Sequence, residues 1–437
     1  MRELRRVERD RVPWPSELVD RVRHVVDAVT AAGHGPQQVS DEELRRRLED
    51  AQDERLRDAQ FQVLRKEMPL ATFASMAGRS YGQLLLQRSL GAIIAADDHP
   101  GLQAAGAEAA AAALAAGGAV AELSAVHLLQ LLGRDGQLLR HRLPDLRTTT
   151  STVDDAIRSR DAIWVSVGAS HLVRLEGGVL RREEVSATSR ALLRRRAAEL
   201  EDMAAALPHD PVPGGPNPGD DVITLAEREG LAMYSDDCAL RAQARARGVP
   251  AFGTTELIAA TGLPAEKTAE LVMTLAAEYV VDLPLTGEQA AALQAATGWP
   301  DGPGVIPLNR HQWWQQPGDR ISAWRTVARA AAAEAPQELV SVTRVALGGA
   351  LEQCDPGRMR QRYQQVVVAA LLAAHEAGSG VPADFLTQLA EPASPEIIPE
   401  PMYVHLALFE ALRAEGVTDP GAVAASLLPQ FVIGPAA

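Results

Sequence analysis

Acidic side chains in the middle of the chain, most of them in doublets, are the residues best suited to chemistry. They stand at four places: Glu122, Asp154-Asp155, Asp220-Asp221 and Asp236-Asp237. Glu122 and the last doublet each follow an apolar run typical of a strand, and in open α/β sheets ligands bind at the carboxyl ends of strands. Ionised carboxylates that crowd together need a cation, and hard oxygen ligands are those that Mg²⁺ or Mn²⁺ takes. The pattern therefore favours metal-assisted hydrolysis of phosphodiester bonds.

Helix capping is the alternative interpretation of each acid taken singly. Asp220 and Asp236 have the position of N-cap residues, and Thr152 with Asp155 fits a capping box. A cap needs only one acid, however, whereas doublets recur at three of the four places. We therefore interpret the acids jointly as metal ligands, and the predicted set is Glu122, Asp155, Asp220, Asp221, Asp236 and Asp237.

The elements that must position these acids are predicted from residue 118 onward. Short apolar runs alternate there with helical patterns, which is typical of a parallel sheet with crossover helices. Strands are predicted at Val120-Ala121, Ile163–Val167, His171–Leu175, Leu231–Tyr234 and Val249–Phe252. Helices are predicted at Val126–Leu132 and Cys238–Arg247, and the proline-rich stretch Leu207–Gly219 is predicted to be a loop.

Helical patterns fill both flanks of this region. The first hundred residues include a capping box at Ser40–Glu43. After Leu263-Pro264, helices are predicted at Glu266–Glu278, Glu288–Ala296, Ser322–Ala333, Val340–Leu351 and Arg358–His375. We therefore divide the chain into a helical N-terminal region (1–100), an α/β domain (101–262) and a helical C-terminal domain (263–437).

Composition excludes several classes of protein. The 437 residues carry 57 acidic and 43 basic side chains, a net charge of -14, so contact with a nucleic acid must depend on a local basic patch. Cys238 and Cys354 are too few for a disulfide framework or a structural zinc site. No run approaches 18 apolar residues, so we expect no membrane partner. We expect a reduced, soluble, cytoplasmic protein.

The sequence around the last doublet resembles a known family. Leu231–Leu240, continued by Gly248-Val249-Pro250 and Gly253-Thr254, resembles the C-terminal part of a PIN domain. That family shows an apolar strand, Thr/Ser-x-Asp, a helix, Gly-Val/Ile and a Gly-Thr turn. Three upstream segments resemble its first strand and the segments of its second and third acids, in the same order: Ala119–Val126, Thr152–Ile157 and Asp221–Ala226.

The resemblance, which covers Gly118 to about Ala260, implies a fold and an activity. It implies a three-layer α/β/α sandwich with a central parallel sheet, flanked here by all-α regions. Active PIN domains are Mg²⁺- or Mn²⁺-dependent ribonucleases with four metal-binding acids. The matching catalytic acids are Glu122, Asp155, Asp221 and Asp237, with Asp220 as an alternative third acid and Asp236 as an extra ligand. Glu122 replaces the usual Asp, and Asp155 replaces the usual Glu.

Four side chains near these acids are expected to contact the RNA substrate. Ser124 and Ser235 occupy the hydroxyl positions of the family's motifs, and Arg241 and Arg245 lie one helical turn apart directly after Asp237. Arginine is suited to binding phosphate. The sequence therefore predicts an endoribonuclease with a carboxylate-bound Mg²⁺ or Mn²⁺.

Two alternative functions stay open. The altered first acid, Glu122, is compatible with a nuclease-dead PIN scaffold whose helical regions bind a protein partner or a second copy of the chain. Leu70–Leu90 also fits a helix-turn-helix, typical of a DNA-binding regulator, although Leu84, Leu85 and Leu86 dominate its second helix.

Overall fold

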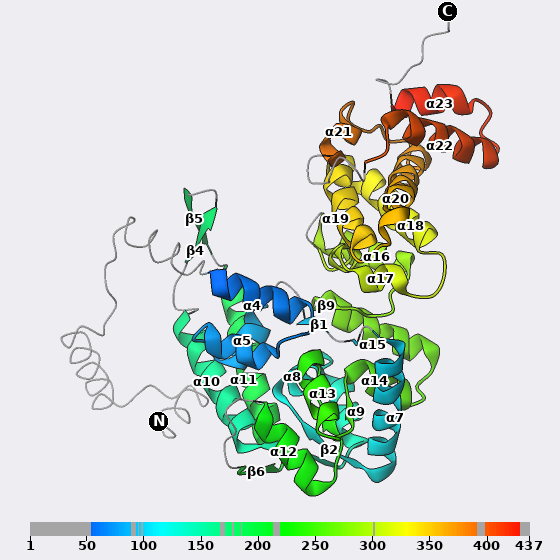
Figure 1. Ribbon diagram of the computed structural model, residues 1–437. Coiled ribbons are helices and arrows are strands. Elements are labelled where there is room, and N and C mark those ends of the chain that lie inside the picture. Colours follow the sequence, from blue (N-terminus) through cyan, green and yellow to red (C-terminus); the bar gives the residue numbers. More distant parts are fainter. Residues whose placement is uncertain are drawn as a thin grey trace, which may run out of the picture. The chain divides into compact units, whose positions relative to one another are not determined.

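The computed structural model describes residues 54–88, 93–94, 96–97, 99–166, 171–176, 179–184, 186–212, 219–299, 302–390 and 398–428 (Figure 1). The chain divides into two compact units, residues 1–57 with 170–185 and residues 58–169 with 186–437. In the first unit, β4 (His171–Glu176) and β5 (Val179–Glu184) form an antiparallel hairpin, which confirms the strand predicted at His171–Leu175. The predicted capping box at Ser40–Glu43 lies outside the described residues.

A five-stranded parallel sheet forms the centre of the α/β region in the second unit. Its strands are β2 (Gly118–Ala121), β3 (Asp145–Thr149), β6 (His209–Asp210), β7 (Met233–Tyr234) and β8 (Ala251–Phe252). They lie in the order β6-β3-β2-β7-β8, and the pairings along the sheet are parallel. Numbered along the chain this order is 3-2-1-4-5, in which the direction of sheet growth reverses between β2 and β7. Such a switch point is where open α/β sheets bind their ligands.

Helices connect these strands, so the chain has a mixed α/β fold with helical flanks. The helices of this region are α7 (Pro100–Ala116), α8 (Leu123–Leu131), α9 (Arg134–His141), α10 (Thr150–Ser166), α11 (Ala187–Ala205), α12 (Asp220–Glu229), α13 (Cys238–Ala246) and α14 (Thr254–Ala260). Apolar side chains of α12 and α13 pack on β2, β7 and β8 in one buried cluster around Val120, Ile223 and Met233. Burial of this cluster fixes both helices against the sheet.

One predicted strand, Ile163–Val167, is wrong, because α10 continues through Ser166. The buried residues of α10 are Thr152, Val153, Ala156, Ser159 and Ile163, which recur at the three- and four-residue spacing of a helix face. Val165, by contrast, is 80% exposed, which a buried central strand would not allow.

Before the sheet, the second unit contains two short helices and a short strand. After α4 (Glu54–Leu64) come α5 (Leu70–Met76) and α6 (Tyr81–Gln87), where the sequence predicts a helix-turn-helix. Gly78 joins the two helices with φ +64°, which glycine adopts readily. Leu84, Leu85 and Leu86 are buried. The apolar side chains of α6 therefore belong to the protein core.

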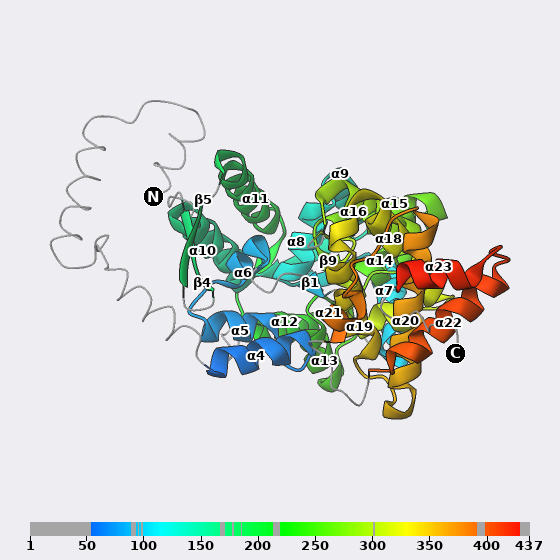
Figure 2. The ribbon, with the colours of Figure 1, turned by 90° about the horizontal axis from the view of Figure 1, so that it is seen from above.

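The C-terminal part of the second unit is helical (Figure 2). Its helices are α15 (Ala265–Ala277), α16 (Gly287–Thr297), α17 (His311–Gln315), α18 (Arg320–Glu334), α19 (Leu339–Leu351), α20 (Pro356–Glu376), α21 (Phe385–Ala390), α22 (Pro401–Ala414) and α23 (Pro420–Leu427), with 3₁₀ turns η1 (Ile306–Asn309) and η2 (Pro336–Glu338). The five helices predicted after Leu263 are confirmed within two residues. α20 packs against α18, α19 and α22, and the indole of Trp324 donates a 2.9 Å hydrogen bond to the Val366 carbonyl.

A second, two-stranded parallel sheet joins a segment that precedes the five-stranded sheet in the sequence to one that follows it. β1 (Ile93–Ile94) pairs with β9 (Val280–Val281). None of the helices in the described part of the chain has the length and apolarity needed to cross a bilayer.

Candidate functional site

Glu122 stands at the end of β2, at the switch point of the sheet. It is 3% exposed and caps α8, since its Oε2 accepts a 3.0 Å hydrogen bond from the Ser124 backbone N–H. The same oxygen accepts hydrogen bonds from the Ser124 hydroxyl (2.5 Å), the Ser235 hydroxyl (3.0 Å) and the Tyr81 hydroxyl (3.4 Å). Burial raises the pKa of Glu122 to about 7; the serine hydrogen bonds oppose this rise, and the nearby Asp237 carboxylate adds to it.

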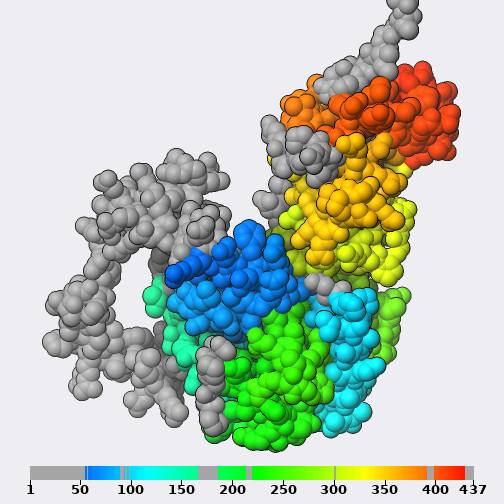
Figure 3. Space-filling view, in the orientation of Figure 1, coloured from blue at the N-terminus to red at the C-terminus, as the bar shows by residue number. Residues whose placement is uncertain are grey.

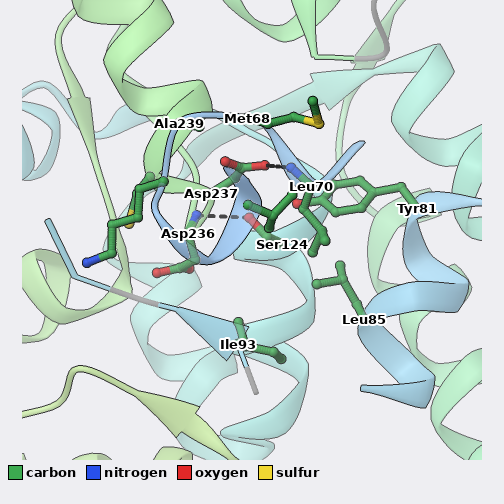
Figure 4. Close-up of a pocket in the computed structure, with 12 residues that line it drawn as sticks. Met68, Leu70, Tyr81, Leu85, Ile93, Ser124, Asp236, Asp237 and Ala239 are labelled. Carbon is green, nitrogen blue, oxygen red and sulfur yellow. Dashed lines mark hydrogen bonds between the residues drawn. The ribbon is translucent and has the colours of Figure 1, made fainter. Parts of the chain in front are cut away.

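Asp237 follows β7, the neighbouring strand on the other side of the switch point. Its Oδ1 accepts a 3.1 Å hydrogen bond from the Leu240 N–H and caps α13, so Asp237 is the cap residue of this doublet. Its Oδ2 accepts a 2.6 Å hydrogen bond from the Leu70 N–H, 167 residues away in the sequence (Figure 4). Burial raises the pKa of Asp237, although these backbone N–H donors oppose the rise.

Asp155 lies inside α10, which begins at Thr150, so the predicted capping box with Thr152 does not form. Its carboxylate instead accepts hydrogen bonds from the N–H groups of Tyr81 (3.4 Å) and Gly82 (2.9 Å) at the start of α6. Arg158 makes an ion pair with it at 3.2 Å. Asp155 thus meets the same helix whose Tyr81 hydroxyl contacts Glu122.

Asp236 points away from Asp237, as Figure 4 shows. Its carboxylate accepts hydrogen bonds from the backbone N–H (2.8 Å) and the hydroxyl (2.6 Å) of Thr254. It is 1% exposed, and burial raises its pKa to about 6 against the opposing effect of Arg241. Asp236 therefore holds the start of α14 to the end of β7.

Asp220 and Asp221 form the first turn of α12, with Gly219 as the N-cap residue. Asp221 is 6% exposed, and Asp220 is half-buried. A Cβ placed on Gly219 would lie 2.4 Å from Leu240 Cδ1, so the start of α12 lies against the first turn of α13. Both acids thus lie at the N-terminal end of α12, beside the first turn of α13.

Ser124 and Ser235, predicted to contact substrate, connect the two strand ends. The Ser124 hydroxyl accepts a 2.9 Å hydrogen bond from the Asp236 N–H, and the Ser235 hydroxyl accepts one of 3.1 Å from the Asp237 N–H. Because both hydroxyls also donate to Glu122, they fix its carboxylate relative to β7.

Arg241 and Arg245, the predicted phosphate ligands, both pair with Asp97. Arg241 is fully buried, with Nε 3.3 Å from Asp97 Oδ2, and it donates a 2.7 Å hydrogen bond to the Ser235 carbonyl. Arg245 Nη2 lies 3.0 Å from the same Asp97 oxygen. In this conformation Arg241 stabilises the β7–α13 turn, and Arg245 donates a 3.1 Å hydrogen bond to the Ala251 carbonyl of β8. The role of both toward RNA stays a prediction.

Residues 66–88, which contain α5 and α6 and which we call the cover segment, lie over the acids. In Figure 3 their blue surface directly adjoins the green surface of the region that contains Asp237. The space left beneath is a cavity of about 40 Å³ lined by Leu70, Tyr81, Ser124 and Asp237, among others (Figure 4). Such a volume holds a few water molecules and is too small for a nucleotide.

The acids do not fit a divalent cation in this conformation. Among the residues that the structure describes, no three His, Cys, Asp or Glu side chains are grouped so as to hold one ion. Both oxygens of Asp155 and Asp237, and Oε2 of Glu122, accept hydrogen bonds from N–H or O–H donors. In this conformation the N–H and O–H donors hold the carboxylates in place, so a cation would need the carboxylates to regroup around it.

The sequence did not predict that Leu70, Tyr81 and Gly82 donate hydrogen bonds to the acids of this site. Two of the three contribute backbone N–H groups only, and every residue other than proline has such a group. Tyr81 offered a signal, since a tyrosine is rarely buried without a partner for its hydroxyl. Burial, followed by the charges of Glu122 and Asp237, raises the pKa of Tyr81, so its hydroxyl stays protonated and donates.

Comparison of the chain with protein-family models, with curated proteins and with solved structures finds no match.

Proposed function

We propose that the chain contains a PIN-type domain, of three-layer α/β/α architecture, that hydrolyses RNA phosphodiester bonds with Mg²⁺ or Mn²⁺, and that the described conformation is its closed form. One observation carries the proposal. Acids from two adjacent strand ends, Glu122 and Asp237, meet at the switch point of a parallel sheet, and Asp155 reaches the same cover segment.

Burial of these carboxylates supports the proposal further. Glu122 and Asp237 are at most 8% exposed, and the Asp237 charge lies near enough to oppose ionisation of Glu122. Buried acids with perturbed pKa values concentrate at functional sites, because stability alone would favour apolar residues there. The proposal requires the cover segment to move before the acids bind a cation or RNA.

A nuclease-dead scaffold is the second candidate, and one observation favours it. Each acid that contacts the cover segment already accepts hydrogen bonds from it, through the N–H groups of Leu70, Tyr81 and Gly82 and the hydroxyl of Tyr81. Donors of this kind satisfy buried carboxylates permanently if the cover segment never moves. The domain would then act through a protein partner.

Cleavage of labelled single-stranded RNA in millimolar Mn²⁺ separates the two candidates, with Leu70→Pro as the informative variant. This change deletes the N–H that Asp237 Oδ2 accepts. Leu70 is the first residue of α5, where proline is tolerated, and Pro69 already has the extended conformation (ψ 139°) that a residue before proline needs. Leu70→Ala is the matched control, since it shortens the side chain and keeps the N–H.

We expect Leu70→Pro to cleave RNA faster than Leu70→Ala and to gain a larger rise in melting temperature from Mn²⁺, because binding to the folded state alone stabilises it. Adding Asp237→Asn should abolish both effects. If neither the wild-type protein nor Leu70→Pro cleaves RNA or responds to Mn²⁺, the nuclease proposal is wrong and the scaffold is favoured.

A further inference from the structure

Both ends of the cover segment are anchored to one short stretch of the C-terminal half, residues 278–282, which we call the latch segment. Lys66 begins the cover segment and Arg88 ends it, and each makes an ion pair with a latch residue. Strand β9 lies within the latch segment and pairs with β1, which follows the cover segment in the chain.

The first anchor is a buried ion pair shared by three side chains. Lys66 Nζ lies 3.0 Å from Asp282 Oδ2, with the two side chains 8% and 1% exposed. Arg310, between η1 and α17, binds the same carboxylate through two hydrogen bonds of 2.6 and 2.9 Å. Asp282 therefore joins the start of the cover segment to the C-terminal helices.

The second anchor lies at the other end of the cover segment. Arg88 makes an ion pair with Glu278, and its guanidinium stacks over the Tyr279 ring at 4.6 Å. Arg196 of α11 binds the second oxygen of Glu278 at 2.5 Å. The Ile93 N–H adds a 3.0 Å hydrogen bond to the Tyr279 carbonyl.

Backbone strain is concentrated at these anchors. Five non-glycine residues among those described have positive φ, and four of them belong to the two segments: Lys66 (62°), Arg88 (49°), Tyr279 (63°) and Asp282 (64°). Residues with side chains adopt this region rarely, and they persist there only where the surroundings hold them, as at switches and ligand clamps. At each anchor, the contacts between the cover segment and the latch segment thus help to hold these residues in that conformation.

We propose that the latch segment holds the cover segment shut over the acids, and that the C-terminal helices control access to the acids through Arg310 and Asp282. The mechanical part of this proposal stands on the contacts alone. Its consequence for catalysis rests on the proposed nuclease function.

Amide hydrogen exchange of Leu70, Tyr81 and Gly82 in the full-length protein tests the latch. Asp282→Asn removes the charge that holds Lys66, and asparagine tolerates the left-handed conformation of this residue. Lys66→Met removes the partner charge and keeps the aliphatic stem. Asp135→Asn is the matched control, because it neutralises a more exposed ion pair, with Lys267.

We expect exchange at these three amides to rise by about 100-fold in Asp282→Asn and in Lys66→Met, as breaking a buried ion pair should produce. Asp135→Asn should leave the exchange of these three amides unchanged. In all three variants, the exchange of the α20 amides should also stay unchanged. The double variant should exchange little faster than Asp282→Asn alone, since that change already removes the ion pair with Lys66.

Unchanged exchange in both latch variants would overturn the proposal. Equal acceleration throughout α20 would overturn it too, because the ion pair would then hold the whole fold and not the cover segment. Mn²⁺ titration of Asp282→Asn distinguishes this failure from failure of the nuclease proposal. Faster exchange without Mn²⁺ binding would support the latch proposal and contradict the nuclease proposal. Tighter Mn²⁺ binding with unchanged exchange would support the nuclease proposal and contradict the latch proposal.

Discussion

Glu122→Gln is expected to stabilise the folded protein above pH 7 and to leave its stability near pH 4.5 almost unchanged. Glu122 is 3% exposed, and its four hydrogen-bond donors all meet one oxygen, Oε2. The amide oxygen of glutamine can accept the same four hydrogen bonds. The variant therefore keeps the contacts and removes only the titration.

The expected gain follows from the pKa of the carboxyl group. Burial raises the pKa of Glu122 from 4.5 to about 7, and at about 1.4 kcal/mol per pH unit this amounts to roughly 3 kcal/mol. Between these two pH values the folded carboxyl keeps its proton while the unfolded one has lost it. Rising pH therefore favours the unfolded state, and the wild-type protein carries the full cost above pH 7.

Other buried groups titrate in the same window, so the wild-type curve alone is not diagnostic. Asp236, whose pKa burial raises to about 6, acts in the same direction as Glu122. His127 acts in the opposite direction, because burial lowers its pKa from 6.5 to about 4 and the unfolded state alone binds the proton between these values. The difference between variant and wild type at each pH isolates Glu122.

Urea denaturation between pH 4.5 and pH 8, with a chelator present, measures this difference. Glu266→Gln, an exposed acid at the start of α15, is the control and should show no pH-dependent difference. A Glu122→Gln difference that stays flat with pH, or a variant less stable than wild type at pH 8, would refute the reasoning. A flat difference would mean that the carboxyl has the same pKa in the folded and the unfolded protein. A less stable variant would mean that the carboxylate is held better than the amide.

Two further substitutions test the packing around the site and in the C-terminal helices. Arg241→Met should lower the free energy of unfolding by about 3 to 5 kcal/mol, because it removes a fully buried cation that pairs with Asp97 and donates to the Ser235 carbonyl. Arg247→Met, in a more exposed pair, should change the free energy of unfolding by at most about 1 kcal/mol; chemical denaturation measures both. Gly349→Ala should lower the melting temperature, because the new Cβ would lie 2.2 Å from the Leu308 carbonyl oxygen. This clash should cost about 1 to 3 kcal/mol of stability. Gly380→Ala, whose Cβ would have nothing within 4 Å, should change the melting temperature little. Equal effects within either pair would contradict the described packing.

Local patterns were enough to predict some of the elements, but β3 was not predicted and β6 lies in Leu207–Gly219, which was predicted to be a loop. The strands at β2, β7 and β8 and the helix α13 are short apolar or amphipathic runs bounded by glycine and acidic residues, and these signals act within a few residues. The error at Ile163–Val167 has the same origin. A short apolar run fits a strand or a buried helix face equally, and only its packing on neighbouring elements decides.

The strand order and the closure of the site did not follow from the sequence. Glu122 and Asp237 were expected to lie close together because both follow predicted strands, and their meeting depends on β2 and β7 being neighbours. The cover segment was expected to be two helices, yet nothing local indicates that Leu70 will bind an acid 167 residues away. Contacts made by backbone N–H groups carry no signature in side-chain types.

Closure and cation binding oppose each other, and this opposition connects the two proposals. An ion held by both Asp155 and Asp237 would require their carboxylates to leave the N–H groups of Gly82 and Leu70, so each event weakens the other by the same free energy. A tighter latch must then lower the affinity for Mn²⁺, and Mn²⁺ must speed amide exchange in the cover segment. A permanently closed scaffold would show neither effect, because its acids always accept hydrogen bonds from the N–H groups and never bind a cation.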